Sequence, residues 1–160
     1  MAEGEGERTK KRVMVAIDES ECSHHALEWT LANLRDSLSS PLLIYTVQPL
    51  QNVSFLAAAS YGSPPPELIR SVQEYQQKVS LALLEKAKEI CSERGVVAET
   101  ITEMGDPKEA ICQAVEKFDV SLLILGNHGK GALQRAFLGS VSNYCVHNAK
   151  CPVLVVKKSG

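Results

Sequence analysis

Apolar residues form short runs that alternate with longer stretches in which they recur every three or four positions. The runs at 12–17, 42–47, 120–125 and 152–156 are nearly continuous, which is typical of strands covered on both faces. A fifth run, 96–103, alternates in part through Val97, Glu99, Ile101 and Glu103. This partial alternation predicts an edge strand with one wetter face.

Helical spacing predicts four helices between these five strands. Ser20 or Ser23 can cap the first helix, in which apolar residues recur at Ala26, Leu27, Thr30, Leu31 and Leu34. The longest helix covers about residues 67–94 and ends at Gly95, and its apolar stripe consists of Leu68, Val72, Tyr75, Val79, Leu83, Ala87 and Ile90.

The third helix has a distinct start at Asp106-Pro107. Asp is a preferred cap, and Pro in the first turn loses no needed hydrogen bond. A short fourth helix follows Gly139-Ser140. The segment 48–66 carries Pro64-Pro-Pro66 and is irregular, because helix cannot run through it.

The alternation of strands and helices predicts the fold class. It is an α/β fold with a doubly wound, five-stranded parallel sheet and helices on both faces, a Rossmann-like architecture. The 160 residues fit one domain. We expect residues 1–11 to form a disordered tail and residues 12–160 to form the domain.

Charge and targeting patterns exclude several function classes. A net charge of −2 argues against nucleic-acid binding, and no apolar run approaches the roughly 18 residues that span a bilayer. The N-terminus has Glu3, Glu5 and Glu7 and lacks the apolar middle of a secretory signal. We therefore expect a cytoplasmic protein with no nucleic-acid partner and no membrane association.

The chain has five cysteines, an odd number that fits reduced thiols in the cytosol. Cys145, His147 and Cys151 have spacings that zinc could use, but no second ligand pair accompanies them. Buried thiols are favoured over a metal site, and we expect none.

The position of two residues nominates a ligand site. In doubly wound sheets ligands bind at the carboxyl ends of strands, where the strand order reverses. Asp18 follows the first predicted strand and Gly126 the fourth. The segment from Gly126 to Ser140 is rich in glycine and leads into a helix, whose N-terminal N–H groups favour a phosphate.

The standard phosphate motifs fail on this segment. Gly126 and Gly131 have the spacing of a P-loop, but Ala132 and Leu133 replace Lys and Ser or Thr. The dinucleotide pattern begins at Gly129 and Gly131 and fails at Gln134. Spacing alone leaves a phosphate cradle and a structural turn equally open.

A longer signature decides between them by resemblance. Gly126, Gly129, Gly139 and Ser140 match the Gly-x2-Gly-x9-Gly-Ser/Thr pattern of the universal stress protein family. The opening residues 13–20 and the closing residues 151–156 are also similar to that family. The resemblance covers about residues 12–158 in the right order.

The resemblance implies a nucleotide-binding member, because members with a complete signature bind ATP or AMP. Mg²⁺ would accompany ATP. The implied nucleotide-binding residues are Ala16, Ile17, Asp18, Val47, Leu125, Gly126, His128, Gly129, Lys130, Gly139, Ser140 and Val141.

Each implied residue has a role in the resemblance. Asp18 would contact the ribose and the adenine edge, and Ala16, Ile17, Val47 and Leu125 would line the adenine pocket. The glycines, Ser140 and Val141 would hold the phosphates, with His128 and Lys130 beside them. Several nucleotide-binding relatives have Pro-Thr or a similar pair where this chain has Ala16-Ile17, so apolar contact with adenine would remain but a hydroxyl hydrogen bond would be lost.

The family's properties imply a dimeric regulatory module of the stress response that binds its nucleotide without catalysis. Val153 to Val156 would pair across a two-fold axis, since an exposed terminal strand invites pairing. Two alternatives stay open. One is an enzyme for slow ATP hydrolysis, or for adenylyl transfer on the related adenine nucleotide alpha hydrolase-like fold, with Asp18 or His128 as the base. The other is a chaperone-like or redox-responsive interaction protein that uses the 48–66 segment and the cysteines.

Overall fold

A parallel sheet forms the centre of the computed structural model, which describes residues 11–48, 65–127 and 140–158. Its strands are β1 (Val13–Ala16), β2 (Leu42–Gln48), β3 (Ala98–Met104), β4 (Leu122–Asn127) and β5 (Val153–Lys157). Their order is β3-β2-β1-β4-β5, and every neighbouring pair is parallel. The predicted fold class is confirmed, and β3 is an edge strand as expected.

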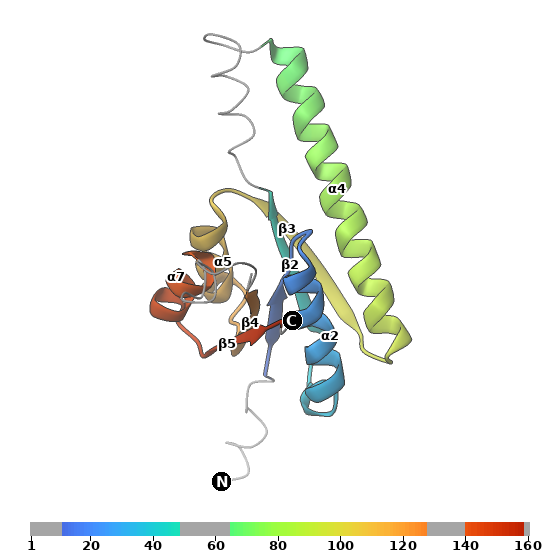
Figure 1. Cartoon of the computed structure of the whole chain (residues 1–160), viewed down its shortest axis with the longest axis vertical. Helices are drawn as coiled ribbons and strands as arrows, with labels where there is room; N and C mark the ends of the chain where they lie inside the picture. The colour runs from blue at the N-terminus through green and yellow to red at the C-terminus, as the bar shows by residue number, and fades with distance from the viewer. Residues whose placement is uncertain (1–10, 49–64, 128–139, 159–160) are drawn as a thin grey trace.

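Helices cover both faces of the sheet (Figure 1). They are α2 (Glu21–Asn33), α4 (Pro66–Glu93), α5 (Pro107–Lys117) and α7 (Ser140–Asn148), with a 3₁₀ turn η1 (Arg35–Ser37) after α2. Helices α2 and α4 pack on the face that carries Val15 and Ile44. Helices α5 and α7 pack on the face that carries Met14 and Leu43. Neighbouring residues of one strand therefore pack into apolar layers on opposite faces of the sheet. This explains why the strand sequences are continuously apolar and do not alternate with polar residues.

The starts of two helices resolve the capping predictions. Ser20 caps α2, and its Oγ accepts a hydrogen bond from the Ser23 N–H at 3.2 Å. Asp106 occupies the cap position of α5, but its side chain makes no capping hydrogen bond. Its Oδ2 lies 3.6 Å from Lys108 Nζ instead. The predicted helix start is therefore correct, but the predicted capping hydrogen bond of Asp106 is wrong.

The apolar stripe predicted for α4 is correct only in its second half. Leu83, Ala87 and Ile90 pack into the core, but Leu68 and Tyr75 are 38% and 69% exposed. The first half of α4 extends past the ends of the strands, so it has no sheet beneath it (Figure 1). A helical repeat alone does not reveal whether a neighbouring element is present to pack against.

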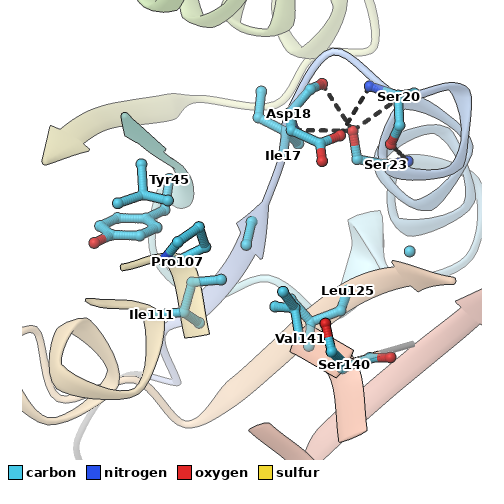
Figure 2. Close-up of a pocket in the computed structure, with 14 residues that line it drawn as sticks. Ile17, Asp18, Ser20, Ser23, Tyr45, Pro107, Ile111, Leu125, Ser140 and Val141 are labelled. Carbon is cyan, nitrogen blue, oxygen red and sulfur yellow. Dashed lines mark hydrogen bonds between the residues drawn. The ribbon is translucent and has the colours of Figure 1, made fainter. Parts of the chain in front are cut away.

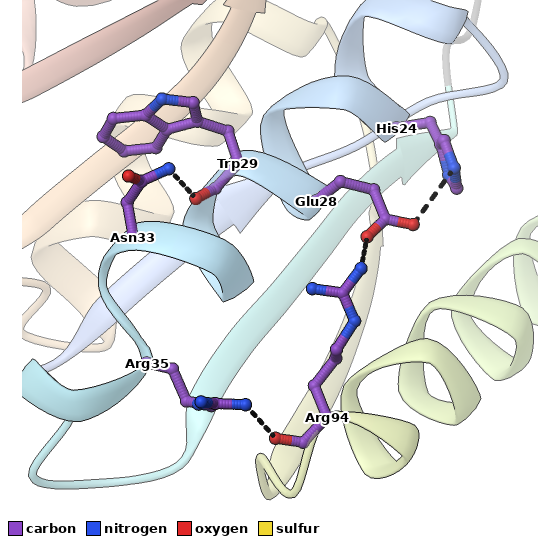
Figure 3. Close-up of polar contacts among 6 residues, drawn as sticks. All are labelled: His24, Glu28, Trp29, Asn33, Arg35 and Arg94. Carbon is purple, nitrogen blue, oxygen red and sulfur yellow. Dashed lines mark hydrogen bonds and ion pairs between the residues drawn. The ribbon is translucent and has the colours of Figure 1, made fainter.

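The far end of α4 is closed as predicted and is tied to α2. Gly95 has a φ of +73°, and the Val96 N–H returns to the Cys91 carbonyl at 2.9 Å. Arg94 Nη2 donates to Glu28 Oε1 at 2.7 Å, and Glu28 Oε2 lies 3.6 Å from His24 Nε2 (Figure 3). Polar contacts thus join the helices that share this face.

Residues 1–10 and most of the 48–66 segment lie outside the described residues. Lys11 is described, and its backbone bonds to Ser39 Oγ at 3.1 Å and to the Ser40 hydroxyl at 2.7 Å. Within the described ranges, no helix has the length and apolar character needed to cross a membrane.

Candidate functional site

A cavity of about 280 Å³ lies where the strand order reverses. The chain passes from β1 to β2 on one side and from β4 to β5 on the other, so the carboxyl ends of β1 and β4 lie side by side. The described lining residues are Ala16, Ile17, Asp18, Ser20, Ser23, Tyr45, Val47, Pro107, Ile111, Leu125, Gly126, Ser140, Val141 and Ser142. Figure 2 shows them around one central space.

The turn from β1 into α2 is held by its own hydrogen bonds (Figure 2). The Asp18 carboxylate accepts from the Ser20 N–H at 2.8 Å. The Ser23 hydroxyl accepts from the Asp18 N–H at 3.0 Å and lies 2.9 Å from the Asp18 carbonyl. The carboxylate is therefore fixed in orientation although its residue is exposed to solvent.

Gly126 is a glycine because α2 begins directly against it. A Cβ at this position would lie 2.6 Å from the Cys22 carbonyl carbon and 2.9 Å from the Ser23 nitrogen. No side chain fits there without moving one of the two backbones. The phosphate role of Gly126 stays a prediction from the family signature, and the structure adds that the first turn of α2 leaves no space for a side chain here.

Tyr45 forms one wall of the cavity and is fully buried. Its ring faces the cavity beside Ile111, while its hydroxyl donates to Glu103 Oε1 at 2.8 Å (Figure 2). Burial, reinforced by the Glu103 carboxylate, raises the pKa of Tyr45 well above its usual value. Lys117 Nζ donates to Glu103 Oε2 at 2.7 Å and holds the pKa of that carboxyl below its usual value. Tyr45 therefore stays neutral, and its hydroxyl is engaged by Glu103.

Helix α7 begins at the cavity, and its first three residues line it. The N–H groups of a first helical turn have no partners within the helix, and the helix dipole places partial positive charge there. Asp18 is the one charged side chain among the described lining residues. The site therefore pairs a fixed carboxylate at the β1 end with helix N–H groups at the α7 end, across an apolar middle.

The described residues contain no group of three His, Cys, Asp or Glu side chains placed to hold a metal ion. Cys145 and Cys151 both belong to the apolar layer between the sheet and helices α5 and α7. All five cysteines are free thiols. His147 Nδ1 lies 2.8 Å from the Asn143 carbonyl one turn earlier in α7.

The model of the universal stress protein family matches residues 10–157. The chain belongs to the universal stress protein family. One relative, the universal stress protein A-like protein of Arabidopsis thaliana, is 34% identical over 92% of this chain and 90% of its own length. The universal stress protein YxiE of Bacillus subtilis is 34% identical over 91% of this chain and 98% of its own.

A solved structure of a universal stress protein from Arabidopsis thaliana, with AMP bound, has a TM-score of 0.69. It is 30% identical to this chain and covers 94% of it, and 93% of that protein is covered in turn. Family membership and fold therefore agree.

The structure brings together eight of the twelve residues that the universal stress protein resemblance implied. The eight that line the cavity are Ala16, Ile17, Asp18, Val47, Leu125, Gly126, Ser140 and Val141. The other four, His128, Gly129, Lys130 and Gly139, lie outside the described residues.

Sequence reasoning does not assign six of the described lining residues to the site, namely Ser20, Ser23, Tyr45, Pro107, Ile111 and Ser142. Tyr45 precedes Val47 by two residues on β2, so the strand period alone places both on one face. The sequence identifies Pro107 only as the start of a helix, and Ile111 follows four residues later. They stand one turn apart on α5, which begins at the same edge of the sheet as the other lining segments.

Proposed function

We propose that this universal stress protein binds an adenine nucleotide in the cavity at the strand switch point. The observation that carries the proposal is the convergence of eight implied residues on that one cavity. AMP bound to a relative 30% identical over nearly the whole chain supports the ligand class. AMP or ATP is the expected ligand, with Mg²⁺ accompanying ATP.

The adenine and ribose would occupy the β1–β2 side of the cavity. Ala16, Leu125 and Ile111 offer apolar surface, and the Asp18 carboxylate can accept hydrogen bonds from ribose hydroxyls. The Tyr45 carbonyl accepts from the Ile17 N–H at 2.8 Å. Val47 has the same orientation two residues later, where β1 has already ended, so its carbonyl would be available to accept a hydrogen bond from the adenine edge.

The phosphates would lie at the start of α7. The backbone N–H groups at this helix start and the Ser140 hydroxyl are donors suited to phosphate oxygens. Gly129 and Gly139 would complete the cradle, and Lys130 and His128 would contribute beside it. These four roles stay predictions from the family signature.

We propose binding rather than turnover as the activity. Among the described lining residues Asp18 is the one candidate base, and its carboxylate already accepts from the Ser20 N–H. A second carboxylate that could share a metal ion with it is absent from this described lining. Slow ATP hydrolysis is therefore the weaker proposal.

The regulatory unit would be a cytoplasmic homodimer formed through β5. This strand is the last of the sheet, and Val153 to Val155 are only partly buried within one described chain. Pairing of two such edges would satisfy backbone groups that a single chain leaves at the edge. Five free thiols fit a reducing compartment.

The proposal is tested by identifying what the purified protein carries. Protein denatured after purification, or after incubation with AMP or ATP and desalting, should release an adenine nucleotide detectable by mass spectrometry at about one per chain. Release from ATP-loaded protein as intact ATP supports binding without turnover. Protein that releases no adenine nucleotide under either loading contradicts the proposal.

A further inference from the structure

Three of the five cysteines gather on one side of the sheet. Cys112 on α5, Cys145 on α7 and Cys151 before β5 all belong to the apolar layer between these helices and the sheet. Cys91 belongs to the apolar layer on the opposite face, and Cys22 lies on α2, which packs on that same face. The sheet separates the two sets, so Cys22 and Cys91 cannot reach the group of three.

Cys112 and Cys145 are in direct contact within this group. Their Sγ atoms are 3.9 Å apart, and they come from different helices. A disulfide is about 2.05 Å long, so the sulfurs need to approach by about 1.9 Å. Small rotations of two cysteine side chains, or a small shift of one helix, supply a movement of this size. Cys112 is partly exposed, whereas Cys145 has no exposed surface.

We propose that Cys112 and Cys145 form a reversible disulfide when the protein meets a hydroperoxide. The Cys112 thiolate attacks one peroxide oxygen, the O–O bond breaks, and hydroxide departs. The Cys112 side chain is then a sulfenic acid. The Cys145 thiolate attacks that sulfur, the S–S bond forms, and the S–O bond breaks with loss of hydroxide. The two thiols lose two electrons, their two protons join the two hydroxides, and hydrogen peroxide is reduced to two molecules of water.

Exposure sets the order of these steps, because Cys112 is the partly exposed member of the pair and Cys145 is fully buried. Burial raises the pKa of Cys112 and raises that of Cys145 to about 12. Few of these thiols are thiolates at neutral pH, so the reaction is slower than that of an exposed cysteine. The contact with Cys145 favours the disulfide over further oxidation, since the resolving sulfur already touches the sulfur that is oxidised.

The bridge would join two walls of the cavity. Ile111 precedes Cys112 on α5, and Val141 lies one turn before Cys145 on α7. Drawing the two sulfurs together narrows the gap between these helices. We therefore expect oxidation to weaken AMP binding, a consequence that rests on the proposed function, whereas formation of the disulfide does not.

Peptide mapping of the full chain tests the disulfide. Protein treated with hydrogen peroxide and digested without reductant should yield a peptide that joins Cys112 to Cys145 and disappears after dithiothreitol. The Cys151→Ser variant should keep this linkage, and Cys112→Ser should lose it. A linkage through Cys151, or Cys112 oxidised to sulfinic acid with Cys145 still a free thiol, overturns the proposal.

Calorimetric titration with AMP tests the coupling. The dissociation constant of the bridged wild type should rise about fivefold or more and return after reduction, while peroxide-treated Cys112→Ser stays unchanged. An unchanged constant in fully bridged protein overturns the coupling. Reduced protein that does not bind AMP rejects the proposed function and leaves the disulfide map standing.

Discussion

Cys22 lies so close to Gly126 that no side-chain carbon fits between them. A Cβ on Gly126 would be 2.6 Å from the Cys22 carbonyl carbon, well inside van der Waals contact. This approach presses the first turn of α2, and with it the Asp18 turn, against the end of β4. The two halves of the switch point are therefore joined by backbone packing.

Replacing Gly126 with Ala should damage both stability and the site. Either α2 or β4 must move, which costs about 1–3 kcal/mol of unfolding free energy in urea titration and lowers AMP affinity. Gly95→Ala is the matched control, because its cost of about 1 kcal/mol arises from a φ of +73° at a position with open space. It should leave AMP affinity unchanged. A Gly126→Ala protein as stable as the wild type would refute the close approach.

Asp18→Asn should weaken AMP binding about tenfold, because one carboxylate hydrogen bond to a ribose hydroxyl is lost. Asn keeps an oxygen for the Ser20 N–H, so the turn should persist. The ligand 2′,3′-dideoxy-AMP, which lacks those hydroxyls, provides the control in calorimetric titration. Wild type and variant should bind it equally. A variant that loses the same factor for both ligands would place Asp18 away from the ribose.

The contact between Lys117 and Glu103 should stabilise the protein in a pH-dependent way. The hydrogen bond from Lys117 lowers the pKa of Glu103 below its ordinary 4.5. The hydrogen bond therefore contributes its full stabilisation above pH 4.5, the ordinary pKa of the unfolded chain. This stabilisation is lost as the pH falls through the lower pKa of Glu103 in the folded protein. Lys117→Met should reduce the unfolding free energy by less than about 1 kcal/mol at neutral pH, since Lys117 is largely exposed.

Thermal and urea unfolding from neutral pH to about pH 3 measure this difference. The gap between wild type and Lys117→Met should stay constant down to about pH 5.5 and shrink below 4.5. Lys88→Met, at an exposed lysine without an ion pair in the described chain, should show no such change. A gap that widens on acidification would contradict the sign of the Glu103 shift.

The backbone N–H groups of β5 that point away from β4 allow a direct test of the proposed dimer. The Leu123 N–H donates to the Pro152 carbonyl at 3.0 Å, so in a parallel ladder the N–H groups of Leu154 and Val156 turn toward β4. The N–H of Val155 then points to the open edge. Val155→Pro removes that donor without removing a bond to β4.

Analytical ultracentrifugation at micromolar concentration should find the wild type as a dimer and Val155→Pro shifted to monomer. Val155→Thr keeps the donor and should remain dimeric. A wild type that is strictly monomeric would reject pairing through β5, and a dimeric proline variant would move the interface elsewhere.

The elements that local pattern controls could be predicted from the sequence. Strands buried on both faces give continuous apolar runs, and Gly95 ends α4 with the backbone that only glycine adopts easily. The first half of α4 could not be placed, because the repeat that includes Tyr75 says nothing of where the sheet ends. The packing of Gly126 against α2 could not be predicted either, because it depends on Cys22, more than one hundred residues earlier.

The candidate site was predictable where residues follow strand ends. Asp18, Val47 and Ser140 each occupy a position that the topology brings to one edge. The strand period could have placed Tyr45 beside Val47, but its contact with Glu103 could not be predicted, because Glu103 lies on another strand and only the fold brings them together. A buried tyrosine needs such a partner, and the sequence does not name it.

Isothermal titration of nucleotide-free protein with AMP tests the central claim most directly. We predict saturable binding at one site per chain, with an affinity that Ser140→Ala lowers about tenfold through the loss of one phosphate donor. Arg94→Met, far from the cavity lining, should bind as the wild type does. No heat of binding at millimolar AMP, or equal affinity in Ser140→Ala, would contradict a phosphate site at the start of α7.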